Sequence, residues 1–470
     1  MNLSGKHILV LGLGESGLAM TRWCLRNDAR VRVADTRSAP PALPLLEKLI
    51  GEGAKAEFLS GEFVKPLLDG IDVLALSPGL SPGLLVVFEA RARGIPIVGE
   101  IELFAYALRE LGVRNQTKVI AISGTNGKTT TTALTAHLCR SVGCDAELAG
   151  NISPAALDAL MSRLDAGRLP EVWVLELSSF QLETLETLNA DAATVLNVSD
   201  DHLDRYIDLN EYAEVKSRVF FGTGVQVLNR NDARVMKMAE VGRWLISFGL
   251  DAPKMLEDFG LCERGGEFWL VQGDNFLLPL WQLPLPGLHN AANVLAALAL
   301  CYVIGLPLVQ LVEGLQSFKG LPHRVEYVAD IGGVRYFDDS KGTNVGATVA
   351  GLSGLGDQDN RKIVLIAGGD GKGQDFSPLR EAVRKHARSV VLIGRDADKI
   401  AAVLGDTGVP LCYAGDMEAA VRAAAAAAQT GDAVLLSPAC ASFDMYRSYV
   451  QRAEVFVAAV RELAAQGGAS

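Results

Sequence analysis

The stretch that most constrains the fold of this chain is VIAISGTNGKTTTT, at residues 119–132. An apolar run typical of a buried strand leads into a short glycine-rich turn, and Lys128 follows where a helix should begin. The N–H groups of such a turn attract phosphate oxygens, the lysine can reach a β- or γ-phosphate, and the Thr129 hydroxyl can bind Mg²⁺. The loop is shorter than GxxxxGK[ST], because the nearest glycine before Gly127 is Gly124. We predict a phosphate-binding loop, with an ordinary turn at a helix start as the alternative.

The length and composition of the chain bound its organisation. At 470 residues it is too long for one compact core, and 49% hydrophobic residues suffice to give each of several domains its own core. Apolar strand-like runs alternate with helical segments, which favours an α/β architecture. We predict three domains: a Rossmann-like domain over residues 1–98, a central P-loop ATPase-like domain over residues 99–320, and a C-terminal Rossmann-like α/β domain over residues 321–470.

Charge and cysteine content argue against several classes of protein. A formal charge of -11 and a pI near 5.2 disfavour a nucleic-acid surface, although a local basic pocket for phosphates is compatible with them. The seven cysteines show no CxxC spacing, which indicates neither a zinc site nor a disulfide framework. The N-terminus lacks a signal-peptide pattern, and no apolar run approaches the roughly 18 residues of a spanning helix. We expect a soluble, cytoplasmic protein without membrane insertion.

A second glycine-rich motif lies near the start of the chain. Residues 7–11 are typical of a strand, GLGESG follows at residues 12–17, and Asp35 ends the next strand 18 residues later. This GxGxxG pattern indicates a dinucleotide or another nucleotide diphosphate, and a tight turn without a ligand is the alternative. Ser77 and Gly79 follow a further buried strand, at the sheet edge where such folds bind ligands.

Polar residues after two strands of the central block are candidate metal ligands. The apolar strand at residues 172–175 delivers Glu176, and P-loop enzymes need a carboxylate there to hold Mg²⁺; a capping or salt-bridged glutamate is the alternative. A strand at residues 193–198 runs into a segment rich in acids around His202, which suits a metal or phosphate site or simply a hydrogen-bonded loop. Lys216 lies in a helix expected over residues 209–220, where a lysine is usually a solvated charge.

Two asparagines near the end of the central block can recognise a base. The amides of Asn290 and Asn293 offer donors and acceptors, as adenine requires, and an N-cap role for Asn290 is the alternative. Beyond them, strands at residues 334–337, 363–367, 390–393 and 433–436 each deliver small or charged residues, which predicts a further α/β unit. Lys341 and Lys372 follow two of these strands and suit either anionic substrates or solvent.

Through these motifs, taken together, the chain resembles the Mur ligases of peptidoglycan precursor synthesis. The resemblance spans essentially the whole chain and rests on several short motifs in the family's order: GTNGKT at residues 124–129, LELSSFQL around Glu176, NVSDDHLDR, HNAAN, LPHRVE at 321–326 and DDSKGTN at 338–344. Within the family the chain is most similar to the members that add D-glutamate. That similarity rests on DTR at 35–37, GEIELF at 99–104, GGDGK at 368–372 and SPACASFD at 437–444, without a DNPR-type motif for a diamino acid.

The resemblance implies roles for the residues around ATP. The loop would hold the phosphates, with Lys128 as a catalytic group, through Gly124, Thr125, Asn126, Gly127, Lys128, Thr129 and Thr130. Thr129 and Glu176 would bind a first Mg²⁺. His202 would bind a second Mg²⁺ together with Lys216 after its carbamylation by CO₂, which turns a repelled ammonium into an anionic ligand. The nucleoside and ribose would contact Asn293, Arg324, Asp339 and Lys341.

The same resemblance implies two further binding sites. The uridine and diphosphate end of a UDP substrate would contact Ser16, Asp35, Thr36, Arg37, Ser77, Gly79 and Asn151. D-glutamate would contact Thr343, Lys372, Ser442, Phe443 and Tyr449. Two departures from the family pattern affect the fine contacts: Glu15 stands in the uracil-side loop, and Gly342 loosens the DSKxTN turn.

The expected activity is an ATP-dependent ligation. The alanyl carboxylate of UDP-N-acetylmuramoyl-L-alanine would become an acyl phosphate and then react with D-glutamate, in a monomeric enzyme of cell-wall synthesis, cell shape and cell division. The third domain would close on the second, because the phosphate loop and Lys341 lie in different blocks. The alternatives are a ligase adding L-alanine, a folylpolyglutamate synthase-like ligase, a nicotinamide-dependent dehydrogenase and a nucleotide-switched binding protein.

Overall fold

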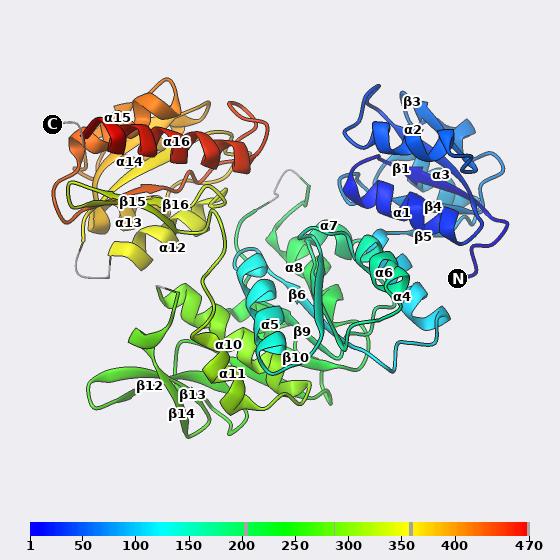
Figure 1. Cartoon of the computed structure of the whole chain (residues 1–470), viewed down its shortest axis with the longest axis horizontal. Coiled ribbons are helices and arrows are strands. Elements are labelled where there is room, and N and C mark those ends of the chain that lie inside the picture. The colour runs from blue at the N-terminus through cyan, green and yellow to red at the C-terminus, as the bar shows by residue number, and fades with distance from the viewer. Residues whose placement is uncertain (202–204, 286, 357–360, 468–470) are drawn as a thin grey trace.

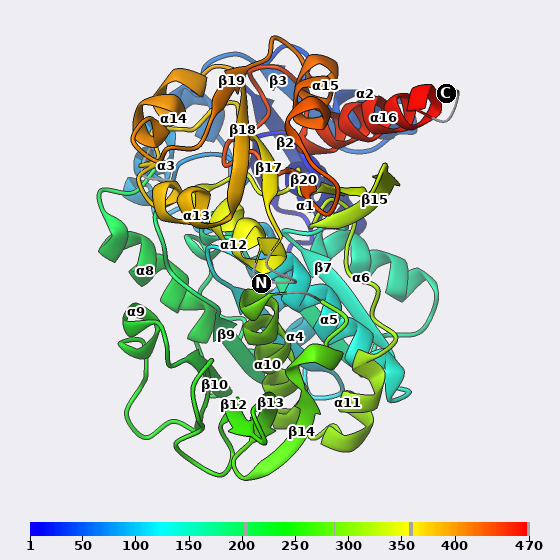
Figure 2. The ribbon, with the colours of Figure 1, turned by 90° about the vertical axis from the view of Figure 1, so that its left-hand side faces the viewer.

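The computed structural model describes residues 1–201, 205–285, 287–356 and 361–467. The chain forms three α/β domains, each built on its own sheet, which we call the N-terminal, central and C-terminal domains (Figure 1). Both terminal domains lie on the same side of the central domain, as the two perpendicular views in Figures 1 and 2 show. Within the described ranges, no helix combines the length and apolar character needed to cross a membrane. The predicted three-domain α/β class is confirmed.

The N-terminal domain is a doubly wound parallel sheet in the strand order β3-β2-β1-β4-β5. Its strands are β1 (His7–Leu11), β2 (Arg30–Asp35), β3 (Ala56–Ser60), β4 (Val73–Leu76) and β5 (Ile97–Val98). The connecting helices are α1 (Glu15–Arg26), α2 (Leu43–Gly51), the 3₁₀ turn η1 (Lys65–Leu68) and α3 (Leu85–Ala92). The strand order reverses between β1 and β4, which opens a crevice at their carboxyl ends.

The central domain has a sheet in the order β14-β13-β12-β11-β10-β9-β6-β8-β7. The strands from β12 to β7 are parallel, and β12, β13 and β14 form an antiparallel extension. The strands are β6 (Lys118–Ser123), β7 (Ala146–Gly150), β8 (Val172–Glu176), β9 (Ala192–Val195), β10 (Val225–Asn229), β11 (Leu245–Phe248), β12 (Phe259–Arg264), β13 (Glu267–Gln272) and β14 (Asn275–Pro279).

The helices of the central domain cover both faces of this sheet. They are α4 (Glu100–Glu110), α5 (Lys128–Ser141), α6 (Ala156–Asp165), α7 (Ser179–Leu182), α8 (Leu209–Ser217), α9 (Ala233–Met236), α10 (Leu288–Val303) and α11 (Leu308–Leu315), with 3₁₀ turns η2 (Arg218–Phe220) and η3 (Leu280–Gln282). Two predicted boundaries differ. The helix expected over residues 209–220 tightens into a 3₁₀ turn after Ser217, and the strand expected to reach residue 198 ends at Val195, because Asn197 turns back to bond the phosphate loop.

The C-terminal domain carries a sheet in the order β15-β16-β20-β17-β18-β19. Its strands are β15 (Glu326–Ile331), β16 (Val334–Asp338), β17 (Ile363–Gly368), β18 (Ala387–Ile393), β19 (Leu411–Tyr413) and β20 (Ala433–Leu436). Its helices are α12 (Val345–Gly356), α13 (Leu379–His386), α14 (Ala397–Leu404), α15 (Met417–Ala427) and α16 (Tyr449–Gly467). The four predicted strands are present, and the short edge strands β15 and β19, which carry weak apolar patterns, were not predicted.

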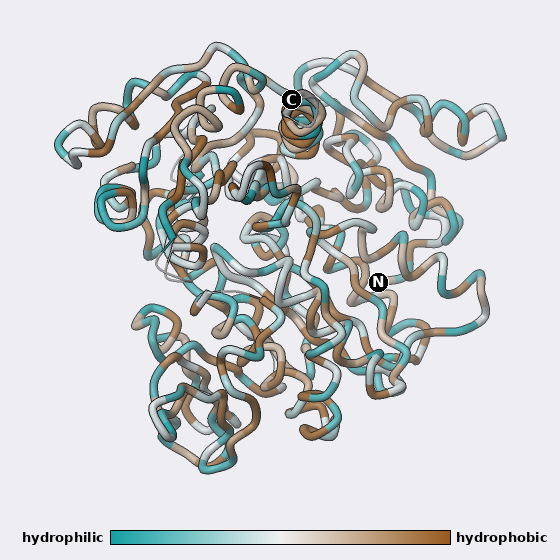
Figure 3. Tube along the Cα trace, turned by 60° about the vertical axis from the view of Figure 1, so that its left-hand side comes forward, coloured by the Kyte–Doolittle hydropathy of each residue, from teal (hydrophilic) through white to brown (hydrophobic). Residues whose placement is uncertain are grey.

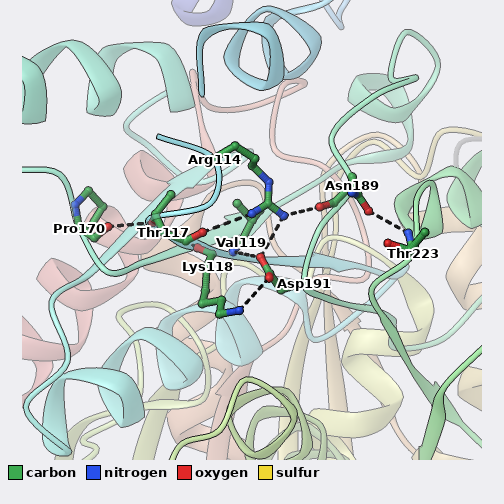
Figure 4. Close-up of polar contacts among 8 residues, drawn as sticks. All are labelled: Arg114, Thr117, Lys118, Val119, Pro170, Asn189, Asp191 and Thr223. Atoms are coloured by element: carbon green, nitrogen blue, oxygen red, sulfur yellow. Dashed lines mark hydrogen bonds and ion pairs between the residues drawn. The ribbon is translucent and has the colours of Figure 1, made fainter. Parts of the chain in front are cut away.

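A polar cluster fixes the central sheet at the end opposite the phosphate loop (Figure 4). Asp191, just before β9, accepts hydrogen bonds from the Val119 backbone N–H at 2.9 Å and from Arg114 at 2.9 Å, and Lys118 pairs with it at 3.2 Å. The Thr117 hydroxyl donates to a further backbone carbonyl at 2.8 Å. These bonds lie at the amino ends of the strands, so the cluster has a structural role. Figure 3 shows further hydrophilic segments along the outer loops of the molecule.

Candidate active site

The phosphate loop connects β6 to α5 and requires glycine at two positions. Gly124 and Gly127 adopt positive φ angles of 146° and 83°. A Cβ at Gly127 would lie 2.4 Å from the Asn293 side-chain oxygen, and one at Gly124 would lie 3.0 Å from Leu196. The backbone therefore passes too close to its neighbours for any other residue. The strand, loop and helix occur as the sequence predicts.

Lys128 reaches back across this loop. Its Nζ donates to the carbonyl oxygens of Gly124 and Thr125, each at 2.8 Å, and burial lowers the pKa of its ammonium. Thr129 and Thr130 follow in the first turn of α5, the first half-buried and the second buried. A lysine held over a ring of backbone groups at a helix N-terminus can bind a phosphate.

Glu176 lies beside the loop because β8 pairs with β6, which places it opposite Ile122. One oxygen, Oε1, accepts a hydrogen bond from the Asn151 amide at 2.8 Å. The other, Oε2, is buried and finds no hydrogen-bond partner among the described residues. A buried carboxylate oxygen without a donor is costly unless a cation completes it. The residues at this position therefore fit a divalent cation.

Lys216 is buried, so the solvated alternative for this residue is wrong. Its side chain is only 1% exposed, Nζ donates to the Gly124 carbonyl oxygen at 2.9 Å, and Nζ lies 4.3 Å from the centre of the Tyr212 ring. Burial, reinforced by the nearby charge of Lys128, lowers the pKa of this lysine well below its ordinary value. A neutral amine is the form that adds CO₂, so the environment fits carbamylation. His202, the expected partner, lies outside the described residues.

A pocket between the central and C-terminal domains brings some of the expected ATP residues together, whereas Gly124, Thr125, Lys128, Thr129 and Lys341 are not part of its wall. Its wall includes Asn126, Gly127 and Thr130 from the loop, Asn290 and Asn293 from α10, and Arg324 and Asp339 from the C-terminal side. Burial lowers the pKa of Arg324, and burial raises the pKa of Asp339 to about 7 although the Ser437 hydroxyl donates to it at 2.6 Å. Burial lowers the pKa of Lys341, and the nearby charges of Arg324 and Glu176 act on this pKa in opposite directions.

Sequence reasoning missed several residues of this pocket. Phe248, Leu285 and His289 also line it, and their apolar or aromatic faces suit a planar base. Burial lowers the pKa of His289 to about 4, which keeps its ring neutral. The HNAAN motif contained the signal for His289, whereas Phe248 ends a strand with no distinctive pattern. Asn290 is not an N-cap, since α10 begins at Leu288 and Gly287 occupies the cap position.

The C-terminal domain touches the phosphate loop directly. The Asn344 amide nitrogen donates to the Asn126 side-chain oxygen at 2.8 Å, although 218 residues separate the two. A Cβ at Gly346 would lie 3.0 Å from the Asn126 amide, so the backbone approaches closely there. Gly342 also has a packing reason: a Cβ would lie 2.6 Å from Asp339 Oδ2 and 2.7 Å from the Ser437 hydroxyl. The glycine lets this turn pack tightly, so our interpretation that it loosens the turn was wrong.

The expected uridine-side residues share one pocket in the N-terminal domain, formed by the GxGxxG loop and the loops after β2 and β4. It is lined by Ser16, Asp35, Thr36, Arg37, Ser77 and Gly79, together with Glu15 and Leu80. Asp35 accepts hydrogen bonds from the Leu13 N–H at 2.7 Å and from Arg37, which lowers its pKa to about 2. A Cβ at Gly17 would lie 1.9 Å from the Gly12 carbonyl oxygen, so the turn requires glycine there.

Asn151 lies apart from this pocket, at the end of β7, where it bonds Glu176. Its loop nevertheless reaches the N-terminal domain, because the Ser153 hydroxyl donates to Glu15 Oε1 at 2.7 Å. Glu15, which departs from the family pattern, thus has a partner across the domain boundary.

The expected D-glutamate residues lie on three loops at the carboxyl ends of the C-terminal strands. Thr343 lies within the DSKGTN turn, and Tyr449 at the start of α16 lies beside this turn, with its ring centre 3.9 Å from Lys341 Nζ. Asp370 and Ala441 exchange backbone hydrogen bonds, which join the Lys372 and Ser442 loops. Ser442 is buried, whereas Lys372 is exposed and Phe443 is 70% exposed. The loops therefore meet, but these last two side chains point to solvent.

Comparison with known proteins identifies the family. Three family models match successive parts of the chain: the MurD-like N-terminal domain of Mur ligases over residues 6–99, the Mur ligase middle domain over 122–301, and the Mur ligase glutamate ligase domain over 323–440. Two curated relatives named UDP-N-acetylmuramoylalanine–D-glutamate ligase are 60% identical (Aromatoleum aromaticum, 98% of each chain) and 53% identical (Nitrosospira multiformis, 99% of this chain and 97% of the relative).

Solved structures show the same fold. MurF from Acinetobacter baumannii matches with a TM-score of 0.62 at 17% identity, covering 97% of this chain and 91% of its own. The alanine ligase MurC from Thermotoga maritima matches with a TM-score of 0.61 at 19% identity, covering 97% of this chain and 99% of its own. With its fold, its motifs and its full-length relatives in agreement, the chain belongs to the Mur ligase family, among the UDP-N-acetylmuramoylalanine–D-glutamate ligases.

Proposed function

We propose that this protein joins D-glutamate to UDP-N-acetylmuramoyl-L-alanine at the expense of ATP, in peptidoglycan precursor synthesis. The observation that carries the proposal is the pocket between the central and C-terminal domains. It combines a phosphate loop, two asparagine amides, Arg324 and Asp339 near a buried carboxylate, as ATP-driven activation of a carboxyl group requires. A dehydrogenase would leave all of these groups unused.

The three domains divide the substrates. Residues 1–98 would bind the UDP end through Ser16, Asp35, Thr36, Arg37, Ser77 and Gly79, with Asn151 toward the muramoyl end. Residues 99–320 would bind ATP, and residues 321–470 would bind D-glutamate through Thr343, Lys372, Ser442, Phe443 and Tyr449. The relatives' names support both substrates. We also propose that the protein works as a monomer in the cytoplasm, where ATP is available.

Two Mg²⁺ ions would be held beside the phosphate loop. Thr129 and Glu176 would hold the first ion, and the unpartnered Glu176 Oε2 supports this assignment. His202 and carbamylated Lys216 would hold the second, and the burial of the Lys216 amine, which lowers its pKa well below the ordinary value, supports the modification. Bound Mg²⁺ would supply neutralisation of the charge on the transferring phosphoryl group.

The chain's own groups would organise two chemical steps. In the first, a carboxylate oxygen of the alanyl group attacks the γ-phosphorus, the bond to ADP breaks, and an acyl phosphate forms. Lys128 and the α5 N-terminus would stabilise the negative charge on the phosphate oxygens. In the second, the D-glutamate amine attacks the acyl carbon, the bond between this carbon and the phosphate oxygen breaks, and the amine proton passes to the departing phosphate. Closure through Asn344 would exclude water from the acyl phosphate.

Phosphate release tests this function. We expect purified protein with ATP, Mg²⁺ and UDP-N-acetylmuramoyl-L-alanine to release phosphate when D-glutamate is added, and far less with L-glutamate or L-alanine. Release with L-alanine and UDP-N-acetylmuramate would indicate a sister ligase instead. ATP hydrolysis that does not depend on any amino acid would indicate a nucleotide-switched binding protein.

A further inference from the structure

Arg205 connects the wall of the UDP-side pocket to the central domain. Residues 77–80 form that wall, and the Leu80 carbonyl oxygen accepts a hydrogen bond from Arg205 Nη2 at 2.7 Å. Arg205 lies between β9 and α8, so this bond crosses the boundary between the two domains. None of the roles expected from the sequence used this residue.

The central domain holds the Arg205 guanidinium in place. Its Nε and Nη2 donate to the two oxygens of Glu183, at 3.1 and 2.5 Å. The guanidinium also lies 4.8 Å from the centre of the Phe180 ring, and the Arg205 side chain is only 14% exposed. A bidentate carboxylate pair combined with aromatic stacking fixes both the position and the orientation of an arginine.

The anchors of Arg205 belong to the catalytic side of the central domain. Phe180 lies in α7 and Glu183 directly follows it, seven residues after Glu176 on the same strand–helix connection. Arg205 and the site beside the phosphate loop therefore belong to one rigid part of the central domain. If the pocket wall shifts away from Arg205, it also shifts away from that site. The Ser153–Glu15 bond makes a second contact of this kind, since Glu15 also lines the pocket.

We propose that Arg205 is a positioning residue that fixes the wall of the UDP-side pocket, residues 77–80, to the central domain and so directs the bound UDP substrate toward the phosphate loop. This inference rests on the proposed function. Loss of the guanidinium would free the Leu80 carbonyl and leave Glu183 without its cation, while the ATP pocket, whose wall contains neither residue, would keep its contacts. The effect should therefore fall on one substrate.

The experiment compares Arg205→Ala with Arg205→Lys and with a matched control, Arg22→Ala. Arg22 pairs with Asp158 at 3.4 Å across the same domain boundary but does not line the pocket. For Arg205→Ala we expect the KM and the calorimetric Kd of UDP-N-acetylmuramoyl-L-alanine to rise about tenfold or more, as for a lost hydrogen bond to a charged donor. The KM of ATP should change less than about twofold. Arg205→Lys should recover part of the affinity, because an ammonium can still reach one partner.

Three outcomes would overturn the inference. The first is an unchanged KM for the UDP substrate in Arg205→Ala, the second is an equal rise in the KM of all three substrates, and the third is an equal rise in Arg22→Ala. If Arg205→Ala does not fold, Arg205→Lys and Glu183→Gln provide the same comparison of KM values. Failure of the wild-type protein itself to bind the UDP substrate would instead remove the proposed function, so the two failures are distinguishable.

Discussion

The two domain boundaries of this protein are built differently. The N-terminal and central domains share one continuous hydrophobic core, in which α1 packs against α4 and α6. The C-terminal domain has separate core clusters on the two faces of its sheet, and among the described residues only Leu321, at the start of this domain, packs against a core cluster of the central domain. In place of a shared core, the second boundary has the pocket beside the phosphate loop and the Asn126–Asn344 amide bond.

This difference predicts which of the two boundaries opens more easily. A shared apolar core resists separation, because opening it exposes buried surface at about 25 cal/mol per Å². A boundary with an open pocket and few direct hydrogen bonds opens at low cost, since little packed surface separates and water replaces those bonds. We therefore expect the first boundary to stay closed through the reaction and the second to open and close around ATP.

The largest effect should come from Lys128→Ala, on the central side of the second boundary. Loss of the ammonium that spans the phosphate loop should lower the rate of D-glutamate-dependent phosphate release by roughly 10³-fold or more, as for other cations that face a transferring phosphoryl group. The affinity for the UDP substrate at the first boundary should not change in calorimetry. A parallel loss of UDP-substrate affinity would show that the two boundaries are not independent.

Glu100 allows the stability of the first two domains, which share one core, to be tested. This carboxyl at the start of α4 accepts a hydrogen bond from the Leu157 N–H at 2.6 Å, and burial raises its pKa to about 7. The unfolded chain ionises this group from about pH 4.5 while the folded protein keeps it protonated, so stability falls as pH rises from about 4.5 to 7 and then levels off. The shift corresponds to at most about 3 kcal/mol. Glu100→Gln should remove this part of the decline, as measured by calorimetry.

Asp339 provides the matched test on the C-terminal side, since burial raises its pKa to about 7 as well. Because the cores are separate, calorimetry should show one transition for the first two domains and another for the C-terminal domain. Glu100→Gln should flatten the pH dependence of the first transition, and Asp339→Asn that of the second. A single transition altered by both variants would contradict the comparison.

Lys216→Ala tests the lysine that bonds the phosphate loop at Gly124, within the central domain. We expect activity to fall by more than about 10–100-fold, the range found when only a group that supports a metal ligand is removed, because carbamylated Lys216 would bind the ion itself. Added acetate should restore part of it by supplying the missing carboxylate. Activity that is unaffected by the substitution would remove the carbamate proposal, and a loss without rescue would leave Lys216 a packing role.

The smallest effect should come from Asn344→Ala, which removes the amide bond at the second boundary. One such bond is worth about 1 kcal/mol, so kcat/KM should fall by up to about tenfold. The radius of gyration with ATP and the UDP substrate bound should exceed that of the wild type in solution scattering. Asn344 also accepts a hydrogen bond from the Ala347 N–H in the first turn of α12, so Asn344→Ser separates the two roles: it keeps this cap but cannot reach Asn126. Normal closure in the serine variant would contradict the role of the amide bond.

Local patterns predicted much of the fold and part of the site. The strand–loop–helix order around Lys128 and the position of Glu176 at a strand end follow from short-range periodicity, and the structure contains both. Burial of Lys216 was not predictable, because a helical pattern does not reveal which elements cover a given side chain. The free oxygen of Glu176, the approach of Asn344 to Asn126 and the anchoring of Arg205 all join residues distant in sequence, and only the tertiary fold brings them together.

The central claim is that the site at the second boundary activates the alanyl carboxylate of the UDP substrate by transferring a phosphoryl group to it from ATP. Its most direct test follows ¹⁸O from the alanyl carboxylate of labelled UDP-N-acetylmuramoyl-L-alanine during turnover with ATP and D-glutamate. Because the acyl phosphate loses its phosphate with the bridging oxygen, we predict one ¹⁸O atom in each phosphate released. Phosphate that carries no label from the carboxylate would contradict the account.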